Sequence, residues 1–125
     1  LERLADGEIL LCDGGMGTEL QRTAGDFACP EELNLRNPAA VEAAHRAYFD
    51  AGSDLVETNT FGGARARLRL HGLAEQVREI SFLGAQIARA ACPTGKSCIA
   101  AGITGTVSWC PENNSKTTWR ITIWK

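Results

Sequence analysis

The chain has 125 residues, of which 44% are hydrophobic and 22% charged, and its formal net charge is -2 at pH 7. This composition is typical of a globular domain and excludes intrinsic disorder and collagen-like repeats. The small negative charge and the lack of a basic run give no electrostatic surface for nucleic acid or an anionic membrane, so we expect a small-molecule partner. No apolar run is long enough to span a bilayer and the start lacks the layout of a secretory signal, so we expect a cytoplasmic protein.

The first predicted element is a strand over residues 8–14, where a short apolar run is followed by glycines. The glycines favour a buried strand over a buried helix. The strand ends in the glycine-rich turn Asp13-Gly14-Gly15-Met16-Gly17-Thr18. Because ligands of parallel sheets bind beyond the carboxyl ends of the strands, this turn is the first candidate site.

A helix and a second strand follow. Asn37-Pro38 predicts the helix start, since Asn caps exposed N–H groups and Pro presets φ at the first helical position. Apolar residues recur at helical spacing up to Gly52, which is placed where a positive φ would end the helix. The second strand, over residues 55–58, runs into the polar stretch Glu57-Thr58-Asn59-Thr60-Phe61. Two strand ends of this kind can face one pocket.

The alternation of helices and strands continues along the chain. Residues 64–70 predict a short helix, and an apolar stripe at steps of three and four predicts a longer helix over residues 73–91. A turn at residues 93–96 leads to a third apolar strand at residues 97–103. Helices that alternate with apolar strands indicate an α/β fold with a parallel sheet, covered on both faces.

Residues 107–125 differ from the rest of the chain. All three tryptophans lie there, beside an Asn-Asn-Ser-Lys-Thr-Thr stretch, and no earlier pattern continues. Trp and Ile at alternate positions fit an edge strand over residues 118–124. A frameshifted or misjoined end explains the change equally well, and both interpretations stay open.

The five cysteines are interpreted as reduced thiols that fill small apolar spaces. Their number is odd and they form no CxxC pair, which argues against a closed disulfide framework. They are Cys12, Cys29, Cys92, Cys98 and Cys110. No cluster has metal-ligand spacing, and no nucleophile, base and orienting residue stand together, so the sequence predicts neither a metal ligand nor a catalytic residue.

The glycine-rich turn does not fit a dinucleotide. The third glycine of the GxGxxG pattern is absent, and Glu57 lies too far along the chain to be its acidic partner. The carboxylates of Asp13 and Glu19 would also repel a phosphate. A carboxylate beside exposed backbone amides suits an amino-acid zwitterion, whose ammonium binds the acid and whose carboxylate binds the amides.

Three of the candidate residues also have a structural interpretation. Asp13 can cap the turn that follows it, and Glu57 can form a structural ion pair. Asn59 can order the loop in which it lies.

Four further polar residues carry weaker signals. Thr58 and Thr60 are expected on opposite sides of the chain, so that only one of them faces a given side. His45, in a helix among alanines, and His71, before a glycine, are more often core or surface residues than catalytic ones.

Several stretches of the chain recur, in the same order and spacing, in one enzyme family. They are Leu11-Cys12-Asp13-Gly14-Gly15-Met16-Gly17-Thr18-Glu19-Leu20, Leu33-Asn34, Asn37-Pro38 with Val41, His45, Ala47 and Tyr48, and Ala51-Gly52-Ser53-Asp54-Leu55-Val56-Glu57-Thr58-Asn59-Thr60-Phe61-Gly62. Through them, residues 8–106 resemble the amino-terminal part of the homocysteine S-methyltransferase family. That family includes the homocysteine-binding module of cobalamin-dependent methionine synthase and the betaine–homocysteine methyltransferases.

The resemblance implies a (β/α)8 TIM barrel with its substrate site at the carboxyl ends of the strands. Because such a barrel takes about 200 residues or more, the chain would supply its first three strand–helix units over residues 1–106, followed by the atypical segment 107–125. By the family pattern, Asp13 and the Gly14 backbone would hold the amino-acid group of homocysteine. The further substrate contacts that the pattern implies are Glu57, Thr58, Asn59 and Phe61.

The resemblance also implies zinc, which the family uses to ionise the homocysteine thiol for attack on an activated methyl group. In the family, three cysteines on later strands hold the zinc, one alone and two adjacent. This sequence has no Cys-Cys pair, so none of its cysteines is expected to be a ligand. The methyl donor stays open among betaine, S-methylmethionine and methyl-tetrahydrofolate acting through cobalamin.

We therefore expect a fragment of a zinc-dependent methyltransferase that makes methionine from homocysteine and is inactive alone. The alternative is a noncatalytic small α/β module that binds an amino acid or a similar zwitterion. Both interpretations predict small-molecule partners.

Overall fold

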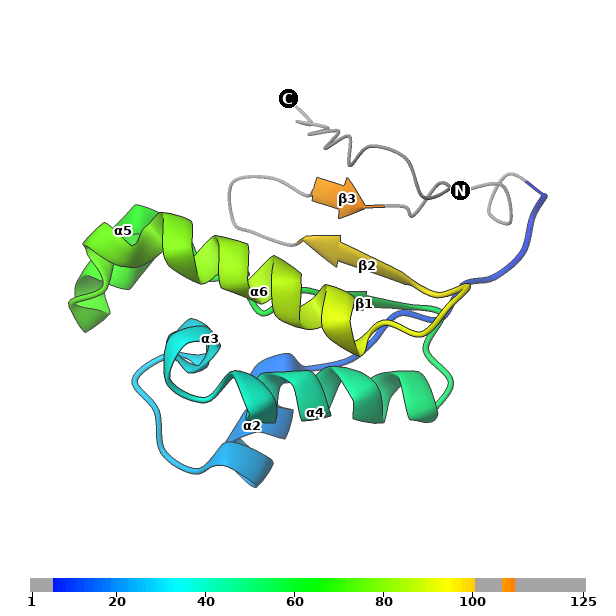
Figure 1. The fold of residues 1–125 in the computed structure, drawn as a ribbon, viewed down its shortest axis with the longest axis horizontal. Helices are drawn as coiled ribbons and strands as arrows, with labels where there is room; N and C mark the ends of the chain where they lie inside the picture. Colours follow the sequence, from blue (N-terminus) through cyan, green and yellow to red (C-terminus); the bar gives the residue numbers. More distant parts are fainter. Residues whose placement is uncertain (1–5, 101–106, 110–125) are drawn as a thin grey trace.

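The computed structural model describes residues 6–100 and 107–109. Its helices are α2 (Met16–Ala24), α3 (Leu33–Arg36), α4 (Pro38–Asp50), α5 (Arg65–Leu68) and α6 (Val77–Ala91), with the 3₁₀ turns η1 (Pro30–Glu32), η2 (Arg69–His71) and η3 (Ala74–Gln76). Its strands are β1 (Leu55–Glu57), β2 (Ser97–Ala100) and β3 (Val107–Trp109). Figure 1 shows the strands in the order β1, β2, β3, with helices α2, α3 and α4 lying beyond β1. No helix in the described ranges is both long and apolar enough to cross a membrane.

The sheet confirms that the second and third predicted strands pair in parallel. β1 and β2 are parallel, with Val56 opposite Cys98. β3 is antiparallel to β2, with Ala100 opposite Val107, so the parallel alternation ends there. The strand predicted over residues 118–124 lies outside the described residues, as do residues 101–106.

The strand predicted over residues 8–14 is wrong as a regular, buried strand. This segment forms one isolated parallel bridge, between Cys12 and Leu55. Two of its apolar side chains face solvent, since Ile9 is 87% exposed and Leu11 is 58% exposed. Hydrophobicity alone did not indicate whether another layer would cover the segment.

Side-chain carboxylates explain why the bridge does not extend into a ladder. On one side of it, the N–H of Glu57 donates to the carboxylate of Asp13. On the other side, the N–H of Leu11 donates to Asp54 at 3.1 Å, and Lys96 donates to the same carboxylate at 3.2 Å. Acidic side chains thus take the N–H groups that a longer ladder would pair with backbone carbonyls.

Both boundary signals of the helix predicted after Asn37 are confirmed. The Asn37 side chain accepts the N–H of Ala40 at 3.3 Å, and Pro38 is the first residue of α4. Gly52 has a φ of 112°, which a residue with a Cβ rarely adopts. The chain then enters β1 three residues later.

The simple turn predicted over residues 13–18 is wrong from Met16 onward, because α2 begins there. Met16, Leu20 and Ala24 recur at steps of four and pack in one core cluster, and Gly25, with a φ of 77°, follows the helix. This spacing is a helix signal, but the neighbouring glycines resemble loop punctuation. The glycine-rich turn is therefore the start of a helix.

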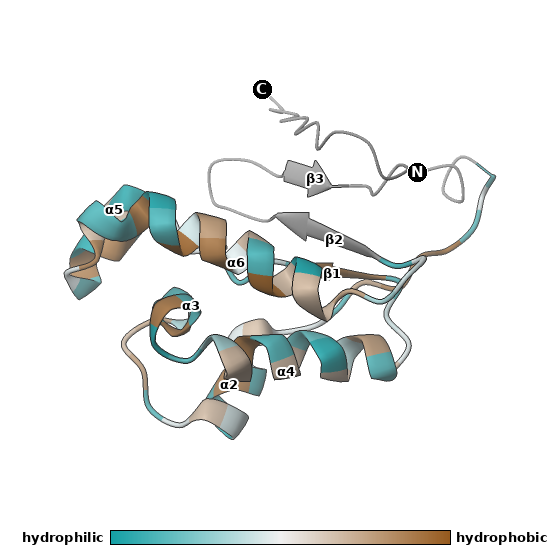
Figure 2. Cartoon of the chain, viewed as in Figure 1, coloured by the Kyte–Doolittle hydropathy of each residue, from teal (hydrophilic) through white to brown (hydrophobic). Residues whose placement is uncertain are grey.

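The two later helices are confirmed. α5 and η2 occupy the predicted short helix, and α6 follows η3 within the predicted longer one. The predicted stripe faces the core of the described structure, where Ile80, Gly84, Ile87 and Ala91 are buried. In Figure 2, hydrophobic residues alternate with hydrophilic ones around α6, as an amphipathic helix requires.

Helices α4 and α6 pack on the same face of β1. Phe49 of α4, Val56 of β1 and Ala88 of α6 form one buried cluster. The neighbours of Val56 in β1, Leu55 and Glu57, point to the opposite face and are partly or fully exposed. The prediction that the sheet is covered on both faces is therefore wrong for β1 in the described part of the chain.

His45 is a core residue of α4. It is fully buried, and neither ring nitrogen has a hydrogen-bond partner among the described residues. Burial lowers its pKa to about 4, because an apolar environment disfavours the charged ring.

We predict that His45 makes the fold acid-sensitive. In the unfolded chain the His45 ring takes up a proton near pH 6.5, whereas in the folded chain it does so only near pH 4. The stability that is present above pH 6.5 is therefore lost as the pH falls toward 4. The loss amounts to about 3 kcal/mol. In urea unfolding between pH 4 and 7.5, His45→Leu should lack this component and keep its stability at pH 7. A variant that loses as much stability in acid as the wild type would contradict the prediction.

Candidate functional site

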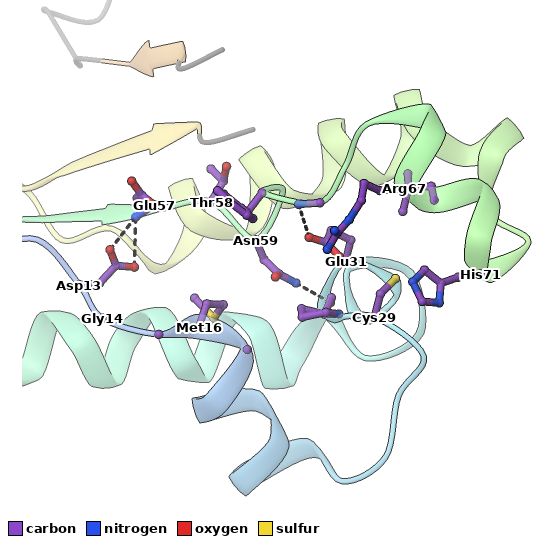
Figure 3. A pocket seen from close by; sticks show the side chains of 16 residues that line it. Asp13, Gly14, Met16, Cys29, Glu31, Glu57, Thr58, Asn59, Arg67 and His71 are labelled. Atoms are coloured by element: carbon purple, nitrogen blue, oxygen red, sulfur yellow. Dashed lines mark hydrogen bonds between the residues drawn. The ribbon is translucent and has the colours of Figure 1, made fainter. Parts of the chain in front are cut away.

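A cavity of about 360 Å³ lies where the first segment and β1 end. The residues that line it and were predicted from the sequence are Asp13, Gly14, Glu57, Thr58, Asn59 and Phe61. Gly15, Met16 and Gly17, which also line it, belong to the glycine-rich turn that was the first candidate site. The remaining lining residues were not predicted as site residues: Cys29, Pro30, Glu31, Gly62, Arg67, Leu68 and His71. The two strand ends thus meet at one cavity, as their common layout predicted (Figure 3).

Asp13 is the group that joins these two strand ends. Both of its carboxylate oxygens lie 3.1 Å from the backbone nitrogen of Glu57, and the thiol of Cys12 donates to one of them at 3.2 Å. Burial raises the pKa of Asp13, while the hydrogen bonds from Cys12 and Glu57 oppose that rise. The site therefore holds a partly desolvated carboxylate, which favours a cationic partner.

Two expectations for this turn are wrong. Asp13 does not cap the turn that follows it, because the N-cap of α2 is Gly15 and no side chain caps this helix. Cys12 does not fill a small apolar space, since it is exposed and its thiol donates to the carboxylate of Asp13. Partial desolvation of the sulfur and this hydrogen bond raise the pKa of Cys12 to about 11, so it is a protonated thiol at neutral pH.

The start of α2 supplies the complementary charge. Gly14, Gly15, Met16 and Gly17 line the cavity, and the first backbone N–H groups of a helix have no partner within the helix. These groups and the helix dipole form a partly positive end that binds anions. A carboxylate and an anion-binding helix end therefore lie side by side in the sequence and at the cavity.

The threonines after β1 lie on one side, contrary to expectation. Their hydroxyl oxygens, in Thr58 and Thr60, are 2.6 Å apart, and both residues are buried. Residues two apart in an extended segment face the same way, which the prediction had reversed. Glu57 is exposed and makes no ion pair with any other described residue, so its structural interpretation is not supported there.

Asn59 orders the loop after β1, one of the roles that the sequence allowed. Its side chain is buried and donates to Pro30 O at 2.7 Å and to Asn34 Oδ1 at 2.9 Å. Phe61, two residues further, is 64% exposed at the cavity. Asn59 therefore shapes the wall that presents Phe61.

The cavity residues differ in charge from one end to the other. Figure 3 shows Asp13 and Glu57 at one end and Arg67 and His71 at the other. Glu31 lies on the wall between them, buried, and accepts the N–H of Gly62 at 2.5 Å. No period or motif in the sequence connects Glu31, Arg67 and His71, because only the tertiary packing of η1, α5 and η2 brings them to the cavity.

The described residues do not fit a zinc ion. They contain no group of three or more His, Cys, Asp or Glu side chains that could hold a metal. Cys29 lines the cavity, but it is buried, and burial raises the pKa of its thiol. A protonated thiol that belongs to no group of three such side chains among the described residues is a poor zinc site.

We predict that the partly buried carboxylate of Asp13 lowers the stability of the folded chain at pH 7. Its pKa is raised in the folded state, so the stability from this group is present at low pH and is lost as the pH rises through the raised pKa. In Asp13→Asn the side-chain oxygen still accepts the N–H of Glu57 but no charge is buried. Urea unfolding at pH 7 should find the variant at least as stable as the wild type. A loss above about 1 kcal/mol would show instead that the carboxylate is a net structural stabiliser.

Comparisons with known proteins agree on one family. The family model described as homocysteine S-methyltransferase matches residues 10–122. Methionine synthase of Mycobacterium leprae is 45% identical over 96 residues, covering 71% of this chain and 8% of that protein. Betaine–homocysteine S-methyltransferase 1 of Bos taurus is 31% identical over 115 residues, covering 87% of this chain and 28% of the relative.

A solved structure agrees with these matches. The homocysteine methyltransferase MmuM from Escherichia coli, in its metallated form, superposes with a TM-score of 0.66 at 25% identity. The superposition covers 82% of this chain and 40% of that structure, so the fold corresponds to part of a methyltransferase barrel. The chain spans less than half the length of each of these relatives. On the extent of the family match, the chain belongs to the homocysteine S-methyltransferase family.

Proposed function

We propose that the chain is the amino-terminal part of a homocysteine S-methyltransferase, in which its cavity binds the amino-acid end of homocysteine. The observation that carries this proposal is the pairing of Asp13 with the start of α2 at one cavity. The ammonium of the substrate would bind the carboxylate of Asp13, and its carboxylate would bind the first N–H groups of α2. These two groups are adjacent in an α-amino acid, as their binding partners are in the chain.

The other predicted site residues would differ in how directly they contact the substrate. Thr58 and Phe61 would line the side-chain end of the substrate, and Glu57 would add negative charge near its ammonium. Asn59 would act mainly by holding the loop, because both of its amide N–H groups donate to Pro30 and Asn34.

The thiol end of homocysteine would bind elsewhere in the parent protein. Zinc, where the family uses it, ionises a thiol for attack on a methyl group, and the described residues provide no ligand set for it. The matched relatives extend well beyond the part that this chain covers, and the ligands would lie on their later strands. We infer that the chain supplies the first strand–helix units of a (β/α)8 barrel and does not catalyse methyl transfer alone.

One observation favours the alternative, a noncatalytic module that binds an amino acid. β3 pairs antiparallel with β2 and covers an edge that a barrel would extend with a parallel strand. Such a module would bind homocysteine measurably without further segments. The barrel fragment would bind only its amino-acid end, and therefore weakly.

The proposal is tested in a chimera. Residues 10–100 of this chain would replace the matching segment of the Mycobacterium leprae methionine synthase, and methionine formation from homocysteine would be measured. The chimera should be active, and Asp13→Ala should raise its KM for homocysteine by roughly 10- to 100-fold, as expected for the loss of a hydrogen bond to a charged group. The 125-residue chain alone should form no methionine and bind no stoichiometric zinc.

Two controls make this result interpretable. Asp26→Ala, which removes an exposed carboxylate outside the cavity, should leave KM unchanged. Circular dichroism would establish that each chimera is folded. A folded chimera without activity, or equal effects of the two substitutions, would contradict the proposal.

A further inference from the structure

A pair of buried amides holds the loop after β1 against α3. Asn34 Nδ2 donates to the backbone oxygen of Asn59 at 2.8 Å and to that of Ile80 at 3.1 Å. In return, Asn59 Nδ2 donates to Asn34 Oδ1 at 2.9 Å and to Pro30 O at 2.7 Å. The two side chains, which we call the amide clamp, are 1% and 4% exposed.

The amide clamp uses its full donor capacity. A primary amide has two N–H groups, and each of the four in Asn34 and Asn59 has an acceptor. A buried polar network that is fully satisfied favours one arrangement, since any shift leaves a buried donor without a partner. The clamp therefore fixes the position of Asn59 relative to η1, α3 and α6.

A second contact holds the far end of the same loop. The buried carboxylate of Glu31, in η1, accepts the N–H of Gly62. A Cβ on Gly62 would lie 2.7 Å from that carboxylate, so a side chain at this position would have to displace Glu31. The loop is thus held on both sides of Phe61, whose ring is exposed at the cavity.

Helix α6 packs closely against the amide clamp at Gly84. A Cβ on Gly84 would lie 2.6 Å from Thr60 Cγ2 and 2.8 Å from Asn34 Nδ2. Contacts below 3.0 Å force a displacement of the neighbouring atoms, so a larger residue at this position would displace the clamp or the helix. Gly84 permits the close approach of α6.

We propose that Asn34, which does not line the cavity, is a positioning residue for it. Through Asn59 it holds the loop so that Thr58 and Phe61 face the ligand. Gly84 supports the same arrangement from α6. The positions of Thr58 and Phe61 follow from the clamp itself, and only the identity of the ligand rests on the proposed function.

The clamp is tested by amide hydrogen exchange in the full chain. Asn34→Ala should raise the exchange rates of Thr60, Gly62 and Gly63 at least tenfold more than those of α4, because the loop would open without the rest of the helix layer. Gly84→Ala should have the same selective effect and covers the case in which Asn34→Ala does not fold. Equal acceleration of the loop and of α4 in the folded variants would overturn the inference.

The matched control is Asn37→Ala. Asn37 is also an asparagine with a side-chain-to-backbone bond, but it caps α4 and lies outside the cavity. Loss of the Asn37 cap should accelerate amide exchange in the first turn of α4. The exchange rates of the loop after β1, relative to those of the core, should stay unchanged. Accelerated exchange at Gly62 in this variant would show that the loop responds to any loss of stability, and would overturn the inference.

A ligand readout separates positioning from a purely structural role. In NMR titrations with L-homocysteine, Asn34→Ala should weaken binding at least fivefold, while Asn37→Ala should not change it. A loosened loop with unchanged affinity would overturn the positioning role. If the wild-type chain gives no response to homocysteine, the proposed function fails. The inference is then decided by two effects of Asn34→Ala in the absence of ligand, on the exchange rates of the loop and on the chemical shifts of Thr58 and Phe61.

Discussion

The hydrogen bond from the backbone of Glu57 to the carboxylate of Asp13 organises this structure. It takes the place of the next ladder bond between the first segment and β1, and so it brings both strand ends to one cavity. A carboxylate used in this way is partly desolvated yet keeps lone pairs for a ligand. The shape of the cavity and the proposed binding of an ammonium group thus depend on the same carboxylate.

The opposite wall of the cavity depends on helix packing. Glu31 holds the loop after β1 at Gly62, and the amide clamp of Asn34 and Asn59 holds it at the other end. α6 can approach this clamp because residue 84 is a glycine. The site is therefore built by two kinds of constraint, a carboxylate between strand ends and buried amides between a loop and helices.

The parts of the fold that local signals determine could be predicted from the sequence. The cap at Asn37, the positive φ at Gly52 and the stripe of α6 depend on near neighbours in the chain, and all three are found. The exposure of Ile9 could not be predicted, because it depends on which layers cover the segment. The candidate residues on the strand ends do line one cavity. Glu31 in its wall and Asn34 behind its loop were not predicted, since tertiary packing alone brings them to the loop.

The central claim is that Asp13 binds the ammonium of an α-amino acid, and NMR titration of the labelled chain with L-homocysteine tests it most directly. The account predicts that the Gly14, Gly15 and Thr58 amides shift in the wild type and do not shift in Asp13→Asn. L-homoserine, which has the same amino-acid end and no thiol, should produce the same shifts. Equal shifts in the wild type and the variant, or shifts confined to residues away from the cavity, would contradict the account.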